Sequence, residues 1–222
     1  MAKFDPSGMD IFSWYPVFTC CVIPRPIPLV STVGKSGVCN LAPYGFFSPL
    51  CAEPPLIGFH VNHRFPDDGT KKHTLINIED TKEFVVCVVT EDLAEKMNHC
   101  SHDYPTDRSE FEGAGLTPVA ADFVKAPLVA ESPINMECRL VQILEFGKGP
   151  VKPAFVIGEI QRVHVKDDVI ENGEIQMSKL RPVGRLGGML YTRCSRDMFE
   201  MESLMGQPPP ELVEGAHRGQ TA

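Results

Sequence analysis

The segment at 40–59, NLAPYGFFSPLCAEPPLIGF, carries small, hydroxyl-bearing and aromatic residues between two apolar runs. Pro43 and Pro49 have no N–H group, so neighbouring main-chain amides and carbonyls are left to meet a ligand rather than a regular strand partner. Small side chains let a planar ligand approach those groups closely. Asn40 has an alternative role as a turn residue after Gly37. We predict a ligand cradle whose polar edge is formed by Thr32, Asn40, the backbone of Leu41 and Ala42, and Pro43.

Three aromatic residues follow within the same segment. Tyr44, Phe46 and Phe47 either form a wall against a flat ring or fill an apolar core. The core is the default explanation for at least two of the three. Tyr44 and Phe47 are included among the predicted ligand contacts.

An anion site is predicted beside the cradle. Ser48 offers a hydroxyl, while Lys72 and Thr74 offer an ammonium group and a hydroxyl at the first turn of an expected helix, whose N-terminal dipole favours negative charge. Taken singly, Lys72 is better explained as a solvated helix residue and Thr74 as a local cap. Because the KKHTLINIE sequence around Lys72 and Thr74 follows the NLAPYGFFSPL sequence around Ser48 in register, the three residues together predict a phosphate site.

Four stretches of sequence set these residues in a wider pattern: PRPIPLVSTV, GVCNLAPYGFFSPL (37–50), EPPLIGF (53–59) and KKHTLINIEDTKEFVVCVV (71–89). The pattern resembles the flavin reductase-like family of FMN-binding split barrels, which includes flavoredoxin and the reductase components of two-component flavin monooxygenases. The resemblance covers roughly residues 15–195. It implies a mainly β fold, a Greek-key-like antiparallel split β-barrel with helical insertions. It also implies FMN, a homodimer, NAD(P)H as cosubstrate and a partner monooxygenase.

A later motif, RPVGRLGGMLY at 181–191, resembles the C-terminal signature of the same family, where the chain returns to the flavin. This resemblance implies catalytic roles for Arg185 and Tyr191. Arg185 is permanently charged and can hold a phosphate of the cofactor or of a nicotinamide nucleotide with two parallel hydrogen bonds. A surface ion pair explains Arg185 equally well. The family often carries serine where Gly45 stands, so one hydroxyl contact is missing here.

Other motifs predict little chemistry. The GKS sequence at 34–36 mimics the end of a Walker loop, but Leu29 stands where that motif requires glycine, so we predict a hairpin turn. His99, Cys100 and His102 form the most metal-like cluster, and no further residue follows at ligand spacing. We therefore predict no metal site.

The elements that must position these residues are mostly strands. Apolar runs predict two short strands within 18–33, around a proline bend, and further strands at 56–61, 83–89, 134–146 and 154–166. Helices are predicted at 71–80, 90–99 and 109–113. The first of these helices should start at Gly69 or Thr70 and bury Leu75, Ile76 and Ile78. Because no regular β-α-β alternation occurs, the pattern favours a closed antiparallel barrel with helical insertions.

Composition limits the function classes. The 222 residues carry a formal net charge of −8, which disfavours nucleic acid as a partner, because binding phosphates depends on Lys and Arg. The sequence has neither a signal core nor an apolar run of the ~20 residues that span a bilayer, so we expect a cytoplasmic protein without membrane contact. The eight cysteines are expected to be free thiols. We predict one domain at 1–206 and a flexible tail at 207–222.

The leading functional hypothesis is an FMN-binding NAD(P)H:flavin oxidoreductase that supplies reduced flavin to a monooxygenase or another acceptor. A chain without an obvious catalytic dyad suits this activity, because the cofactor carries the electron chemistry. The first alternative is a flavoredoxin-like electron carrier that binds FMN and does not oxidise NAD(P)H. A third hypothesis is a barrel that binds heme or another small ligand without redox turnover, for which no proximal ligand stands out.

Overall fold

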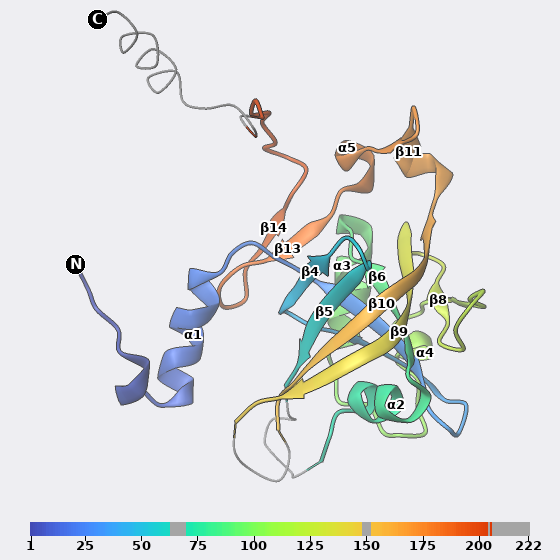
Figure 1. Cartoon of the computed structure of the whole chain (residues 1–222), viewed down its shortest axis with the longest axis horizontal. Helices are drawn as coiled ribbons and strands as arrows, with labels where there is room; N and C mark the ends of the chain where they lie inside the picture. Colours follow the sequence, from blue (N-terminus) through green and yellow to red (C-terminus); the bar gives the residue numbers. More distant parts are fainter. Residues whose placement is uncertain (63–69, 148–151, 204, 206–222) are drawn as a thin grey trace, which may run out of the picture.

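A computed structural model of the chain describes residues 1–62, 70–147, 152–203 and 205. Its largest element is a seven-stranded antiparallel sheet in the order β3-β2-β6-β9-β10-β5-β4 (Figure 1). The strands are β2 (Pro28–Val33), β3 (Cys39–Pro43), β4 (Phe47–Cys51), β5 (Leu56–Val61), β6 (Glu83–Val88), β9 (Ile134–Glu145) and β10 (Ala154–Val165). The predicted mainly β, antiparallel architecture is confirmed.

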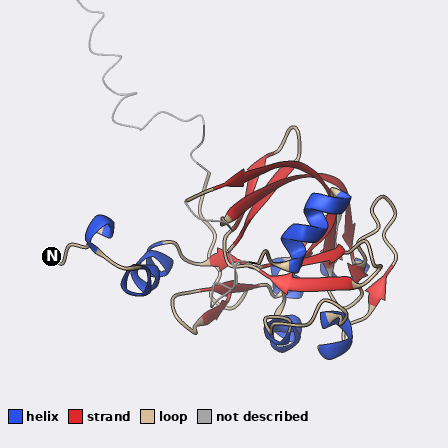
Figure 2. Cartoon of the chain, turned by 90° about the horizontal axis from the view of Figure 1, so that it is seen from below, coloured by secondary structure: helices blue, strands red, loops and turns tan. Residues whose placement is uncertain are grey.

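The large sheet curls, as Figure 2 shows. The pairing of β9 with β10 contains two register shifts, one between Ile157 and Gly158 and one between Ile160 and Arg162. Such irregularities increase the local twist of a strand. A side-chain Cβ at Gly158 would lie 2.3 Å from the ring of Phe84, so the close approach of that ring requires glycine.

Apolar side chains pack against both faces of the large sheet, in two clusters. One cluster contains Leu29, Leu41 and Phe111, and the other contains Val30 and Phe59 together with Leu75 and Ile78 of the helix at 73–81. Leu29 and Val30 belong to different clusters because successive residues of a strand point to opposite faces. The strand that carries the predicted ligand cradle is therefore anchored on one side by core packing.

Three smaller sheets contain the remaining strands of the described residues. β1 (Arg25–Pro26), β13 (Val183–Arg185) and β14 (Tyr191–Arg193) form a second sheet, in which Arg185 lies opposite Tyr191. The other pairs are β7 (Pro118–Val119) with β8 (Leu128–Val129) and β11 (Ile170–Glu171) with β12 (Glu174–Ile175). The second sheet thus brings together residues from the two ends of the described chain.

The helices are α1 (Ile11–Cys21), α2 (His73–Thr81), α3 (Ala94–His99), α4 (Glu110–Gly113) and α5 (Met177–Leu180). Single 3-10 turns occur at Pro6–Gly8, Glu91–Leu93 and Asp167–Val169. The second of these turns and α3 confirm the helix predicted at 90–99, and α4 confirms the one at 109–113. Figure 2 shows that α1 stands out from the body of the molecule.

Helix α1 corrects the strand predicted in the first part of 18–33. The second predicted strand exists as β2, and the two-residue strand β1 lies at the proline bend before it. Asp10 starts α1 by accepting hydrogen bonds from the N–H groups of Phe12 and Ser13, at 2.8 and 3.1 Å. A short apolar run has no period that separates a strand from a helix. Pro16 inside the helix conceals it further, because proline ordinarily marks a helix boundary.

The helix predicted at 71–80 begins later than expected. Lys72 is the N-cap residue of α2, so Thr70 is not the start, and Gly69 lies outside the described residues. Leu75 and Ile78 are buried as predicted, but Ile76 is 39% exposed and does not belong to the buried face. The 100° step between helix residues places Ile76 away from the sheet.

The hairpin predicted at 34–37 is confirmed. The Gly34 N–H donates to the Val38 carbonyl at 3.0 Å, and Gly37 has a φ of +84°, in the left-handed region that glycine adopts most readily. Across the described ranges, no helix is both long and apolar enough to cross a membrane. The tail predicted at 207–222 lies outside the described residues.

Candidate functional site

A cleft runs along residues 43–46, and it consists of three adjoining pockets. Pro43 and Tyr44 line all three. Lys72 lines the first and third pockets, whereas Gly45 and Phe46 line the second and third. Part of the segment predicted to form a ligand cradle is therefore a wall that three adjoining pockets share.

The first pocket gathers six predicted ligand residues from two elements, β3 with the residue that follows it and the first turn of α2. These residues are Asn40, Ala42, Pro43, Tyr44, Lys72 and Thr74. Lys72 is the N-cap residue of α2, where the helix dipole is positive. The pocket therefore places a cationic side chain and a helix N-terminus beside small residues of β3.

Glu110 also lines the first pocket, and sequence reasoning did not identify it. Its side chain is only 4% exposed. In the orientation that satisfies both of its ends, the Asn40 amide donates to Glu110 Oε1 at 3.3 Å and accepts from the Thr74 hydroxyl at 2.9 Å. Glu110 begins a predicted short helix, where an acidic residue is ordinary, so no local signal marked it.

Burial raises the pKa of the Glu110 carboxyl, and a hydrogen bond from the Leu41 N–H, 2.9 Å long, opposes that shift. This contact engages the Leu41 N–H, one of the main-chain donors predicted to meet the ligand. The Leu41 side chain is fully buried in the core. Leu41 therefore fixes the position of β3 through Glu110.

Three other predicted residues lie apart from the lining of the first pocket. Thr32 is fully buried, and its hydroxyl accepts from the Asn77 side chain of α2 at 3.0 Å. Ser48 is exposed on β4 and donates to the Pro49 carbonyl at 2.8 Å. Phe47 packs against the apolar cluster that contains Phe59. The structure does not bring Ser48 together with Lys72 and Thr74 into the phosphate cluster that we predicted.

The second pocket has an aromatic and cationic lining. The residues that give it this character are Tyr15, Arg25, Phe46, Arg185 and Tyr191. The guanidinium carbon of Arg185 lies 4.4 Å from the centroid of the Tyr191 ring, and the side chain donates to the Tyr191 hydroxyl and, at 2.7 Å, to the Gly188 carbonyl. Both residues predicted from the late motif thus lie together on the cleft.

Arg25 is a buried cation in the wall of the second pocket, 6% exposed. Its guanidinium group donates to the carbonyls of Thr19, Val22 and Leu186, the last two at 2.7 Å. These bonds tie the end of α1 to the loop between β13 and β14. Arg25 is a charged residue inside the apolar sequence PRPIPLVSTV. That signal was available in the sequence, and sequence reasoning did not use it.

Gly45, where the family often has serine, faces open space. A Cβ built there would meet no atom within 4 Å. The position is therefore wide enough for a ligand or for a larger side chain. The nearby wall is aromatic, because the Phe46 ring contacts those of Phe18 and His60 with centroids 5.6 and 5.8 Å apart.

The cluster at His99, Cys100 and His102 divides between two surroundings. The two histidine rings are exposed, with centroids 5.2 Å apart, and His99 Nδ1 lies 3.0 Å from the Tyr104 hydroxyl. Cys100 is buried in the apolar cluster around Leu41, and burial raises the pKa of its thiol to about 12. Its thiolate is therefore disfavoured as a ligand.

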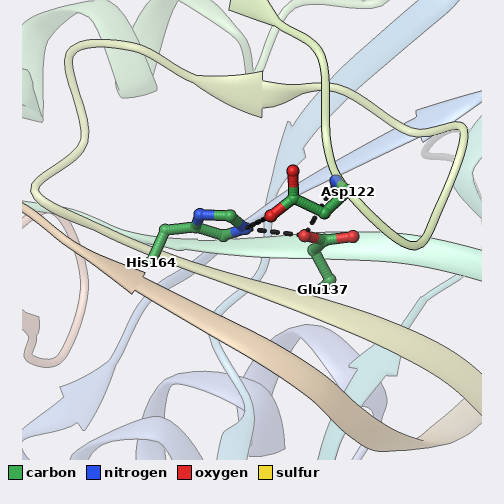
Figure 3. A group of neighbouring side chains, drawn as sticks. All are labelled: Asp122, Glu137 and His164. Carbon is green, nitrogen blue, oxygen red and sulfur yellow. Dashed lines mark hydrogen bonds and ion pairs between the residues drawn. The ribbon is translucent and has the colours of Figure 1, made fainter.

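A different group, Asp122, Glu137 and His164, places one ligand atom from each residue within 4.8 Å of the others (Figure 3). Glu137 is fully buried and accepts from the N–H groups of residues 122–124 at 2.6 to 3.1 Å. His164 Nε2 lies 2.6 Å from Glu137 Oε1, and Asp122 forms an ion pair with Arg162. Backbone N–H groups and His164 therefore surround the Glu137 carboxylate. Through these contacts Glu137 anchors the loop that follows β7.

The chain matches the family model described as "Flavin reductase like domain" over residues 20–193. Nitrilotriacetate monooxygenase component B from Bacillus cereus is similar in structure, with a TM-score of 0.85 and 33% identity over 90% of this chain and 98% of that one. The 2-nitrobenzoate 2-nitroreductase of Pseudomonas fluorescens gives a TM-score of 0.81 and 31% identity over 94% of this chain and 100% of that one.

A third similar structure supports the barrel assignment. It is a flavin-reductase-type protein with a split barrel domain from Shewanella frigidimarina, with a TM-score of 0.77 and 26% identity over 91% of this chain and 99% of that one. The split-barrel fold implied by the sequence motifs is therefore confirmed.

Proposed function

The chain belongs to the flavin reductase-like family, and from this premise we propose that it is an FMN-binding oxidoreductase that takes a hydride from NAD(P)H. The observation that carries the proposal is the shared cleft. Six predicted flavin contacts line its first pocket, and the two residues expected at the far side of the flavin line the second. A cofactor and a cosubstrate can therefore meet along residues 43–46.

The donor set of the first pocket fits a flavin mononucleotide. Lys72 and the first turn of α2 are suited to a phosphate, because cations and helix N-termini favour anions. The backbone of Ala42 is suited to the polar edge of the ring, and the Asn40 amide, which bonds Glu110 and Thr74, would hold β3 in place beside it. Burial raises the pKa of the Glu110 carboxyl in this pocket, because it disfavours the charged form.

The bound flavin would supply the two-electron acceptor for the hydride, and the chain's own residues would supply orientation and exclusion of water. Tyr44 and Phe46 form the wall of the cleft. Arg185 and Tyr191 would hold the nicotinamide nucleotide against it. The name of the Bacillus cereus relative, a monooxygenase component, supports a partner enzyme that consumes the reduced flavin.

A homodimer is part of the proposal. Helix α1 stands out from the body in Figure 2 and exposes large apolar side chains. Ile11, Phe12 and Val22 are 62%, 68% and 56% exposed. Burying such side chains against a second chain would remove them from water at about 25 cal/mol for each Å² of apolar surface.

Anaerobic mixing of the FMN-loaded protein with NADH or NADPH tests the proposed activity. We expect rapid bleaching of the flavin absorbance by at least one of the two nucleotides. Dithionite provides the control for a reducible bound flavin. If dithionite bleaches the flavin and neither nucleotide does, the reductase assignment fails and the electron-carrier alternative replaces it.

A further inference from the structure

The second pocket contains two guanidinium groups and no carboxylate among its lining residues. Arg25 donates only to carbonyl groups, and its buried Nε has no hydrogen-bond partner in the described part of the chain. The groups that accept from Arg185, the Tyr191 hydroxyl and the Gly188 carbonyl, are also neutral. Two positive charges therefore face one pocket without a counter-charge from its walls.

The neighbouring arginines behave differently. Arg181, Arg193 and Arg196 each lie 3.0 to 3.4 Å from the same Glu91 carboxylate oxygen. The chain carries a net charge of −8, so acidic residues are plentiful. The missing counter-charge in the second pocket is thus a local property, and it contrasts with the neighbouring arginines, which share the Glu91 carboxylate.

A buried cation is costly unless an opposite charge accompanies it, and carbonyl oxygens compensate only part of that cost. A guanidinium group presents its N–H donors in a planar fork that matches a carboxylate or a phosphate. The aromatic rings of Tyr15, Phe46 and Tyr191 line the same pocket and are suited to a planar group. The pocket therefore matches a planar ligand that carries an oxyanion.

We propose that Arg25 and Arg185 form an anion-binding subsite for the carboxylate or phosphate group of the second, non-flavin ligand. The identification of that ligand as a substrate rests on the proposed function, whereas the binding of an oxyanion does not. Arg25 is held by the end of α1 and by the β13–β14 loop, so the subsite forms only when both segments are in place. Gly187 in this loop lies against α1, because a Cβ there would be 2.2 Å from the Cys20 sulfur.

Calorimetric titration of the FMN-loaded protein with two matched ligand pairs tests the subsite. Benzoate and benzamide share a planar ring and differ in charge, and the oxidised nucleotides NADP+ and NAD+ differ by one phosphate group and cannot reduce the flavin. We expect benzoate to bind tenfold or more tightly than benzamide, or NADP+ to bind tenfold or more tightly than NAD+, and the pair that is discriminated identifies the oxyanion as a carboxylate or as the additional phosphate. Equal affinities within both pairs would overturn the proposal.

Arg185→Gln should abolish the discrimination, and Arg193→Gln is the matched control, because Arg193 lies on the adjacent strand and is paired with Glu91. Arg25→Lys, which keeps the charge and removes the planar fork, should reduce the discrimination. If Arg25→Lys does not fold, Arg185→Gln alone decides. Full discrimination in Arg185→Gln would contradict the subsite, whereas benzoate binding without flavin reduction by NAD(P)H would contradict only the reductase assignment.

Discussion

The surroundings of Glu137 and the second pocket of the cleft both hold charged groups away from water, and they differ in how completely those groups are paired. Glu137 accepts from three backbone N–H groups and lies 2.6 Å from His164 Nε2. Within the part of the chain that the structure describes, Arg25, in contrast, has only neutral acceptors and an Nε without a partner. Asp122, Glu137 and His164 could bind a metal ion by their residue types, but here they hold a loop in place. The charge of Arg25 is compensated only in part, which indicates that this pocket binds an anion.

The two buried carboxylates sharpen this contrast. Burial alone would raise the pKa of Glu137, but the hydrogen bonds from His164 and from residues 122–124 outweigh it and lower the pKa. Glu110 has fewer donors, so burial prevails and its pKa is raised. The hydrogen bonds of the loop anchor favour the charged form of Glu137, whereas burial in the cleft disfavours the charged form of Glu110.

The largest effect is expected in the cleft. Arg185→Ala should slow reduction of bound flavin by NAD(P)H by about a hundredfold, because a misplacement of ~1 Å between donor and acceptor is sufficient for a loss of that order. FMN affinity should fall by much less. Stopped-flow reduction and FMN titration of the same sample measure both. An equal loss in the two quantities would assign Arg185 to the flavin and not to the nucleotide.

The loop anchor should affect stability without affecting chemistry. Glu137→Gln places an amide nitrogen among backbone N–H donors, and the loss of charge-assisted hydrogen bonds should lower the free energy of unfolding by about 2–3 kcal/mol. Urea denaturation measures this change. Glu145→Gln, which removes an exposed ion pair with Lys152, is the control and should cost less than about 1 kcal/mol.

The flavin of Glu137→Gln should still be reduced at the native rate under conditions in which the variant is folded. A slower reduction would show that the anchor and the cleft are coupled. The distinction between the surroundings of Glu137, as a structural region, and the cleft, as a functional region, would then be wrong.

The smallest effect is a difference in pH dependence. Glu110 binds its proton more tightly in the folded chain, so its contribution to stability should fall as pH rises above the ordinary carboxyl pKa. Glu137 has the opposite sign, and its contribution is lost as pH falls through its lowered pKa. The urea midpoint should be measured across a pH series. In Glu110→Gln the loss of stability with rising pH should disappear, and the loss of stability with falling pH should remain. If the urea midpoints of Glu110→Gln change with pH as those of the native chain do, Glu110 does not cause the loss of stability at rising pH.

The sequence predicted the residues that lie within short motifs. Asn40 to Tyr44, Lys72 and Thr74 carry their signal in local residue types, and they meet because β3 and α2 are neighbours. Glu110 and Arg25 depend instead on contacts between distant parts of the chain. Glu110 reaches a partner 69 residues away, and Arg25 reaches one 161 residues away.

The same reasoning explains the errors in the elements. Strands β5, β6 and β10 carry apolar stretches and β9 carries a partly alternating pattern, so these four strands are visible in the sequence. Helix α1 contains an apolar run interrupted by Pro16, and its start depends on a cap at Asp10 that no pattern of hydrophobicity reveals. Ser48 was grouped with Lys72 by family resemblance, whereas its exposed place on the edge strand β4 depends on the pairing of the sheet.

The central claim, that the cleft along residues 43–46 binds FMN through the first turn of α2, is tested most directly by the FMN dissociation constant of the double variant Lys72→Ala with Thr74→Ala. Charge-assisted hydrogen bonds contribute about 1.5–3 kcal/mol, so affinity should fall at least tenfold relative to the native chain. Circular dichroism of the same sample must show an intact fold. An unchanged dissociation constant in a folded variant would place the phosphate elsewhere and contradict the account.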